Sequence, residues 1–318
     1  MSPVISAVAM SIARVSYRLL RGVTIEPDDV IALVVQPEAR ALEPVPGAPR
    51  LSAASCDSLR QIPVIDEHGD HRQIHVPVER PLTVFLDDRE LVTLMTLGAS
   101  PELLVLGYLR NQRIIGEVAA IESITVDWNS GAAAVKTRSG AHGIAISGVH
   151  RIVSTGCGLG TVFADLMTQV DAITLPQTAT ARISQGILLR VLDTMRQYDA
   201  IHRAAGSVHS CALFHGADLL VSVEDVSRHN GVDTIAGWMA LHGVPGGDKI
   251  LFTTGRLTGE MVMKSAHNGI PIVVSRNGVT AMGYDLAAKL GMTIFGRAAN
   301  RRFLCYIGAE RFDADPAC

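Results

Sequence analysis

A single cysteine stands in a glycine-rich stretch near the middle of the chain, where Cys157 lies in the sequence STGCGLGTVF. A structural cysteine usually packs as a small apolar group among aliphatic side chains. Glycines on both sides instead permit positive φ angles and let a ligand approach the backbone closely. Because the thiolate is the nucleophilic form of cysteine, the pattern predicts a loop that presents a reactive thiol.

A second group of ionisable side chains follows one apolar strand within six residues: Glu224, Asp225, Arg228 and His229. The spacing predicts a helix capped by Asn230, with Asp233 three residues further on as in a capping box. Charged groups at a strand end, beside the free amides of a helix, are typical of ligand sites. A solvated turn with a helix cap is the alternative, and the spacing alone leaves it open.

Two more segments have the composition of anion-binding turns. The stretch TTGR at 253–256 ends in Arg256, before a helix that Thr258 is expected to cap, and it combines hydroxyls, amides and a guanidinium. It lacks the ending of a P-loop, so an ordinary turn fits equally well. The other segment joins small residues to forked arginine side chains, which suit phosphates: Arg297, Ala298, Ala299, Asn300, Arg301 and Arg302. His209, which precedes an apolar strand, has a hydrogen-bonded core histidine as its default interpretation.

The composition limits the classes of function. A chain of 318 residues that is 48% hydrophobic and 19% charged can bury a large core, about two domains in size. Its formal net charge of −3 gives no reason to expect nucleic acid as a partner. Five scattered cysteines without a Cys-x-x-Cys pair indicate reduced thiols in a cytoplasmic protein. No run approaches the length of a membrane helix, and a signal peptide would carry its basic residues first.

The pattern of elements predicts an α/β protein with four parts. Apolar strands alternating with capped helices in the C-terminal half are typical of a mixed sheet covered by helices. The preceding part has two strand pairs, around Asp-Asp and Asn-Ser-Gly turns, and a helix that starts at Pro101 after Ser100 as its cap. The expected parts are a flexible extension (1–60), a small α+β domain (61–153), the cysteine loop (154–162) and the α/β domain (163–318).

Several stretches, in this order, resemble the FdhD family of formate dehydrogenase accessory proteins: PLTVFLDDRELVTLMTLGASPELLVLGYL, the Cys157 loop, HSCALF, EDVSRHNGVD, TTGRLTGEMVMKSAHNGIPIVVS and LGMTIFGR. They cover most of residues 80–308. The resemblance implies a cytidine deaminase-like fold and a homodimer. It also implies a sulfurtransferase that takes a persulfide from a cysteine desulfurase and passes the sulfur to the molybdenum cofactor, in its bis-guanine-dinucleotide form, for formate dehydrogenase.

The resemblance also assigns roles to residues. Cys157 is the loop cysteine that carries sulfur, and no residue is assigned to a metal. The cofactor-binding positions are His209, Glu224, Asp225, Arg228, His229, Arg256, Arg297, Ala298, Ala299, Asn300, Arg301 and Arg302. Many members carry a second loop cysteine where this chain has Gly160. Release of sulfur must then rely on direct attack by the acceptor or on an outside thiol.

Other functions remain as alternatives. A zinc deaminase would need His-x-Glu and Pro-Cys-x-x-Cys, whereas this chain has His209-Ser-Cys211 and no Cys-x-x-Cys. His68, His71 and His75 lie in a polar stretch without cysteine or carboxylate companions of metal-ligand spacing. A chaperone that binds the molybdenum cofactor without moving sulfur is the remaining alternative, because the second loop cysteine is missing.

Overall fold

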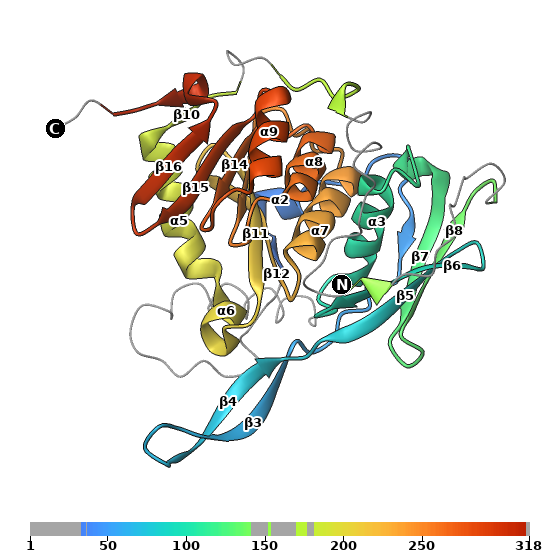
Figure 1. Ribbon diagram of the computed structural model, residues 1–318. Coiled ribbons are helices and arrows are strands. Elements are labelled where there is room, and N and C mark those ends of the chain that lie inside the picture. Colours follow the sequence, from blue (N-terminus) through green and yellow to red (C-terminus); the bar gives the residue numbers. More distant parts are fainter. Residues whose placement is uncertain (1–32, 36, 141–151, 154–169, 177–180, 316–318) are drawn as a thin grey trace, which may run out of the picture.

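The computed structural model describes residues 33–35, 37–140, 152–153, 170–176 and 181–315. Its largest element is a seven-stranded mixed sheet (Figure 1). In spatial order its strands are β1 (Leu33–Val35), β12 (Asp218–Asp225), β11 (His209–His215), β13 (Lys249–Thr253), β14 (Ile272–Ser275), β15 (Thr293–Ala299) and β16 (Arg302–Ile307). Strands β13, β14 and β15 are parallel, and the other neighbours are antiparallel.

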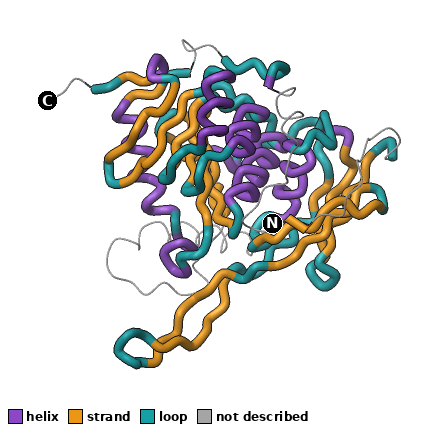
Figure 2. The backbone as a smooth tube through the Cα atoms, in the orientation of Figure 1, coloured by secondary structure: helices purple, strands orange, loops and turns teal. Residues whose placement is uncertain are grey.

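Helices cover both faces of this sheet, as the sequence predicts (Figure 2). Helix α5 (Gln185–Tyr198) packs on one face, against Phe214, Phe252 and Phe295. Helices α7 (Arg228–Leu241), α8 (Gly259–His267) and α9 (Ala281–Lys289) pack on the other. Because successive strand residues point to opposite faces, neighbours such as Leu213 and Phe214 enter different cores. The strands are therefore apolar throughout.

A second sheet of six strands packs against α3 (Pro101–Asn111). Its order is β2 (Arg50–Leu51), β7 (Ile121–Asp127), β8 (Ala132–Thr137), β5 (Arg80–Leu86), β6 (Arg89–Thr96) and β9 (Ile152–Val153). Both predicted strand pairs, β5–β6 and β7–β8, are confirmed. So is the helix at Pro101, although Ser100 makes no side-chain cap hydrogen bond.

Smaller elements complete the described chain. The hairpin of β3 (Leu59–Ile65) and β4 (His71–Pro77) projects away from both sheets (Figure 1). The others are α2 (Pro37–Arg40), α6 (Ala200–Ala205), the parallel pair β10 (Ile183–Ser184) and β17 (Phe312–Asp313), and two 3-10 turns at Val118–Ala120 and Ala309–Arg311. Among the residues described, none forms a helix with the length and apolar character to cross a membrane.

The prediction that residues 1–60 form a flexible extension is wrong for residues 37–60, which make long-range contacts with both sheets or their helices. Val35, just before this segment, pairs with Val221 at the edge of the large sheet, and Leu51 pairs with Ile124 in the small one. The Ser52 hydroxyl donates a hydrogen bond to the buried carboxylate of Glu102. These contacts are long-range, so a segment rich in proline and alanine without periodicity gives no local sign of them. The N-terminal region thus joins the two sheets.

The two sheets are also held together by a close crossing of α3 and α7. A methyl group on Gly107 of α3 would lie 1.7 Å from the carbonyl oxygen of Asp233, and one on Gly237 of α7 would lie 2.0 Å from that of Leu103. The helix backbones therefore touch directly at two glycines. Glycine is required here for close approach, although it lowers intrinsic helix stability.

Replacing either crossing glycine should destabilise the protein. For Gly107→Ala or Gly237→Ala we expect a loss of roughly 3 kcal/mol or more in the free energy of unfolding, because the helices must separate. Urea unfolding measures this loss in the free energy of unfolding. Gly186→Ala in α5 is the matched control, because its new methyl group would meet no atom closer than 3.7 Å. It should be neutral or add up to about 1 kcal/mol. Equal effects at all three positions would contradict the crossing.

Candidate functional site at the carboxyl edge of the large sheet

Strand register brings the predicted site segments to one edge of the large sheet. His209, the first residue of β11, pairs with Asp225, the last of β12. Thr253, the last residue of β13, pairs with Ser275, the last of β14. The carboxyl ends of β12, β13, β14 and β15 therefore meet the amino end of β11. Open α/β sheets bind ligands at such an edge.

The helix after β12 begins three residues earlier than its capping pattern predicts. Ser227 is the N-cap of α7, and its hydroxyl accepts a hydrogen bond from the amide of His229. Asn230 lies inside the first turn and is not the cap, so that prediction is wrong. Asp233 faces α8, where its carboxylate accepts a bond of 2.7 Å from Lys264 Nζ. Asn230 instead binds Asp225 and the carbonyl of Met95 in β6, and Asp233 joins α7 to α8; no local spacing reveals these contacts.

Asp225 ties the edge to the small sheet. One carboxylate oxygen accepts hydrogen bonds from the Thr96 hydroxyl at 2.6 Å and from the amide of Leu97, both at the end of β6. The other accepts bonds from the amide of Ser227 and from the side chain of Asn230. Burial raises the pKa of Asp225 to about 6, and the hydrogen bonds oppose that rise. The carboxylate is therefore fully occupied by protein donors.

Glu224 has a similar structural role toward α6. Its carboxylate accepts hydrogen bonds from the amides of Ile201 at 2.8 Å and His202 at 2.9 Å, in the first turn of that short helix. The Ser210 hydroxyl donates a third, at 3.3 Å. Burial raises the pKa of Glu224, and the two amides lower it. Both acidic side chains of the edge hold neighbouring segments in place.

Positive charge gathers around His209 on the same edge. Its Nδ1 lies 3.3 Å from the Thr254 hydroxyl, which anchors the half-buried ring. Burial lowers the pKa of His209 first, and the nearby charges of Arg228, His202 and Arg256 lower it further. Arg228 is buried, whereas Arg256 is exposed. A neutral imidazole between two guanidinium groups has the electrostatics of an anion site.

His229 has different surroundings, although it follows Arg228 directly. Its Nε2 lies 3.5 Å from Glu260 Oε2, and Lys264 bridges Glu260 and Asp233. Burial, followed by the charge of Lys264, lowers the pKa of His229 to about 2. This imidazole is therefore neutral across the physiological range. It belongs to a buried charge network between α7 and α8.

The TTGR turn is shaped by its own hydrogen bonds. The Thr253 hydroxyl accepts a bond from the amide of Gly255, and the Thr254 hydroxyl accepts one from the amide of Ser210. A methyl group on Gly255 would lie 2.5 Å from Cδ of Arg228. Glycine is therefore needed at this position to leave room for the Arg228 side chain. Both threonine side chains are buried, and the anion cradle stays a prediction. Arg256 is the member of this turn that stays exposed.

The basic turn between β15 and β16 has a strained backbone. Arg297, Asn300 and Arg301 have φ angles of 49°, 50° and 62°, which are rare for side-chain-bearing residues. The amide of Arg297 donates to Asn277, whose side chain donates to the carbonyl of Thr254, both at 2.9 Å. The turn thus starts at the same edge as His209. Ala298 is fully buried and cannot contact a ligand.

The tip of this turn leans on α5. Arg301 Nη1 lies 3.0 Å from Asp193, and Arg196 Nη2 donates a hydrogen bond of 2.6 Å to Asn300. Arg297 and Arg302 are exposed and make no ion pair with the described residues. The turn therefore presents guanidinium groups from the edge outward, over the α5 side of the sheet.

Arg276 is a residue of the edge that sequence reasoning missed. It follows β14 directly, forms an ion pair with the buried carboxylate of Asp199, and lies 5.9 Å above the ring of Phe252. Arg256 lies three residues after the end of β13. An arginine after each of two parallel strands is the sequence signal that would have revealed it.

The last described residues before Cys157 form β9, which runs towards this edge. Cys157 itself lies outside the described residues. Strand β9 ends at Val153, which pairs with Leu94 of β6 in parallel orientation. Two residues further, the end of β6 is bound to Asp225 through Thr96. The chain therefore runs towards the edge as it approaches the glycine-rich stretch.

The Asp225 contact can be tested by an isosteric change. In Asp225→Asn one acceptor oxygen becomes a donor that faces two donors. We expect a loss of about 2–4 kcal/mol in the free energy of unfolding, since hydrogen bonds to charged groups contribute about 1.5–3 kcal/mol each. Chemical denaturation provides the measurement, and Asp218→Asn at the exposed start of β12 is the control. A variant as stable as the control would show that these bonds contribute little.

Comparisons with known proteins agree with this architecture. The model of the FdhD/NarQ family matches residues 77–313. The "Sulfur carrier protein FdhD" of Listeria monocytogenes serotype 4b (strain F2365) is 28% identical over 247 residues, 77% of this chain and 95% of the relative. That of Bacillus subtilis (strain 168) is 30% identical, over 73% and 88%. The crystal structure of a putative formate dehydrogenase accessory protein from Desulfotalea psychrophila has 25% identity and a TM-score of 0.63, over 80% of this chain and 98% of that one. The chain belongs to the FdhD/NarQ family.

Proposed function

We propose that this protein is a sulfurtransferase for formate dehydrogenase maturation. It accepts a persulfide on Cys157 from a cysteine desulfurase and passes the sulfur to the molybdenum cofactor in its bis-guanine-dinucleotide form. The observation that carries the proposal is the route of the chain. Strand β9 runs beside β6 towards an edge where Arg228 and Arg256 bring positive charge close to the neutral imidazole of His209. Four residues of chain span at most about 14 Å, which limits how far Cys157 can lie from Val153 and supports its assignment to this edge.

The first step is an exchange between sulfur atoms. The thiolate of Cys157 attacks the terminal sulfur of the desulfurase persulfide, a new S–S bond forms, and the desulfurase cysteine leaves as a thiolate. Oxidation states are conserved overall. Only one thiol is needed on the acceptor, so Gly160 in place of a second cysteine does not prevent loading. Delivery then proceeds by attack of the acceptor on the outer sulfur, with Cys157 leaving as a thiolate, or by attack of an outside thiol on Cys157 Sγ, which forms a mixed disulfide and releases the outer sulfur as hydrosulfide.

The cargo is large and carries several phosphates, and the edge offers suitable groups. His209, Arg228 and Arg256 lie at its centre, and Arg297 and Arg302 extend the positive surface along the strained turn. Glu224 and Asp225 are bound by protein donors, so they act by positioning these cations. We assign phosphate contacts to the arginines. Ala298, Ala299 and Asn300 supply the shape of the turn.

Further parts of the proposal concern the assembly. The mixed sheet with helices on both faces is compatible with a cytidine deaminase-like domain, and we assign it to that fold. The protein works as a cytoplasmic homodimer, and its partners are the desulfurase, the cofactor and formate dehydrogenase. No nucleic acid or membrane takes part.

Intact mass spectrometry tests the sulfur step. The protein, mixed with a cysteine desulfurase, cysteine and pyridoxal phosphate, should gain one sulfur atom that a reducing agent removes. Cys157→Ser should gain none, whereas Cys305→Ser, which removes a half-buried thiol of β16, should load normally. Absence of loading in the natural protein, with an active desulfurase, would favour the chaperone alternative. Loading of Cys157→Ser would refute the assignment of the carrier residue.

Binding of guanosine diphosphate tests the basic turn. Arg297→Gln with Arg302→Gln should weaken binding at least about tenfold and make it less salt-dependent, because each lost charge-assisted contact costs about 1.5 kcal/mol or more. Titration calorimetry at two salt concentrations measures both effects. Arg89→Gln is the control, at the opposite end of β6 about 24 Å from the edge. Unchanged affinity of the double variant would place the nucleotide elsewhere.

A further inference from the structure

One carboxylate at the carboxyl edge differs from its acidic neighbours. Glu260 is the second residue of α8, so it lies at the same edge as the first residues of α7. Its side chain is 20% exposed, whereas Glu224, Asp225 and Asp233 are buried. A partly open carboxylate beside guanidinium groups weakens the binding of an anion at that place. It therefore suits a ligand group that donates hydrogen bonds, and not a phosphate.

The acidic group one helical turn below the edge is already occupied. Helices α7 and α8 lie side by side and run away from the edge (Figure 1). Between them, Lys264 Nζ donates to Asp233 Oδ2 at 2.7 Å, and the side-chain amide of Asn111 donates to the other oxygen at 2.6 Å. Asp233 thus takes the short hydrogen bond that Lys264 makes in this layer.

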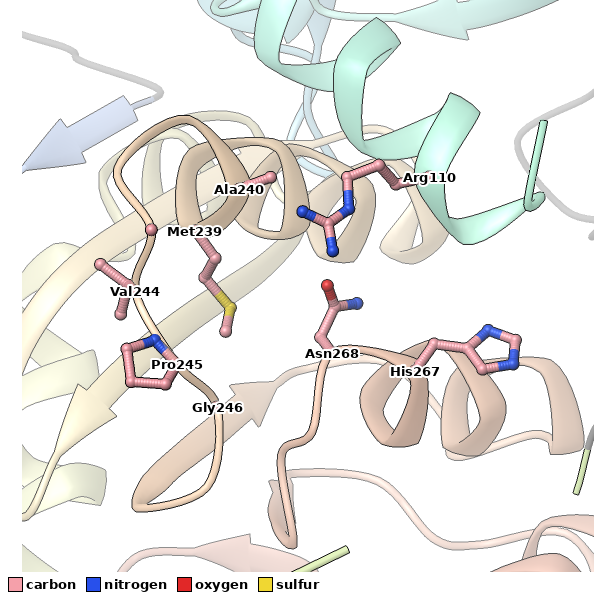
Figure 3. A pocket seen from close by; sticks show the side chains of 9 residues that line it. Arg110, Met239, Ala240, Val244, Pro245, Gly246, His267 and Asn268 are labelled. Carbon is pink, nitrogen blue, oxygen red and sulfur yellow. The ribbon is translucent and has the colours of Figure 1, made fainter. Parts of the chain in front are cut away.

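The same chain of polar side chains continues to the far ends of the helices. Asn268 donates to Asn111 Oδ1 at 2.9 Å and to the carbonyl of Lys264 at 2.7 Å. Asn268 lies there beside Arg110, at a pocket between the ends of α7 and α8 (Figure 3). The carboxyl ends of three helices compensate the charge of Arg110. These bonds fix α3, α7 and α8 relative to one another, so the layer below Glu260 is rigid.

The carboxylate of Glu260 itself has longer contacts. Oε1 lies 3.6 Å from Lys264 Nζ, and Oε2 lies 3.5 Å from His229 Nε2, which has no hydrogen-bond partner among the described residues. Hydrogen bonds between nitrogen and oxygen usually measure about 2.7–3.2 Å. Burial raises the pKa of Glu260, and the charge of Lys264 opposes that rise. Both oxygens therefore keep the capacity to accept hydrogen bonds from a ligand.

We propose that Glu260 recognises the guanine base of the cargo by accepting hydrogen bonds from its N1–H and from its 2-amino group. This inference rests on the proposed function, which supplies the guanine nucleotide. The two oxygens of a carboxylate accept two parallel N–H bonds. Guanine has two adjacent donors on its pairing edge, and adenine, cytosine and uracil have no such pair. Arg228 and Arg256 at the same edge remain for the phosphates.

Calorimetric titration of the full-length protein with the diphosphates of guanosine, inosine, adenosine and xanthosine tests the proposal. The natural protein should bind guanosine diphosphate at least about tenfold more tightly than adenosine diphosphate, with inosine diphosphate in between because it lacks the amino group. Glu260→Gln should weaken guanosine diphosphate at least about tenfold and leave adenosine diphosphate unchanged. The variant should bind xanthosine diphosphate more tightly than the natural protein does, because its amide donates to O2 of xanthine. Misfolding cannot produce such a gain.

Two controls separate recognition of the base from other effects. Glu43→Gln removes the same charge from an exposed glutamate near the far end of α7, where the amide of Val45 donates to the carbonyl of Leu241. It should keep the natural affinity for all four nucleotides. Arg297→Gln with Arg302→Gln should weaken all four by similar factors and keep the preference for guanine, because these arginines are assigned to phosphates.

Several outcomes would overturn the proposal. Equal affinity of the natural protein for guanosine and adenosine diphosphates would show that the base is not recognised. A preference that survives in Glu260→Gln would place the base elsewhere, and equal weakening of both nucleotides would show a purely structural role. Absence of all nucleotide binding in the natural protein would overturn the assigned cargo site as well. Sulfur loading of Cys157 is measured separately, so failure of the sulfur step is distinguishable from failure of base recognition.

Discussion

The direct backbone contact between α3 and α7 is the constraint on which the rest of the structure depends. Gly107 and Gly237 let the helices touch, and this brings the end of β6 beside the end of β12. Asp225 can then accept bonds from both sheets. Side chains at the crossing would move the helices apart by several ångströms and remove these bonds. The candidate site is therefore a property of both sheets, even though its cations come from the larger one.

The arrangement of charge at the edge follows from the same packing. Glu224 and Asp225 are buried, and each carboxylate is surrounded by amide and hydroxyl donors. Their negative charge is therefore compensated by hydrogen-bond donors inside the protein and does not face solvent. Arg256, Arg297 and Arg302 remain exposed on the same edge. A chain with a formal net charge of −3 can thus present a positive surface at one place, because its acidic groups there have structural partners.

The sequence predicted those elements that depend on local residue patterns. Alternation and turn residues located the strand pairs at 80–96 and 121–137, and apolar strands followed by capped helices predicted the mixed sheet. Long-range pairing is not visible in a local pattern, which is why the sequence predicts residues 37–60 as part of a flexible extension. Asn230 matched a capping pattern, yet its side chain binds Asp225 and the carbonyl of Met95. The positions of the strand ends predicted that His209 and Arg256 lie at the site. They did not predict that the carboxylates of Glu224 and Asp225 accept hydrogen bonds from the protein itself.

The basic turn shows how such a site is maintained against its own strain. Three residues with positive φ cost of order 1 kcal/mol each or more, while Ala298 between them is fully buried in the core. The turn is held from two sides, through Arg297 and Asn277 at the edge and through Arg301 and Asp193 on α5. A relaxed hairpin would need neither contact. Two independent contacts preserve this strain and leave the side chains of Arg297 and Arg302 exposed, and this geometry supports the proposal that the turn contacts the phosphates of the cargo.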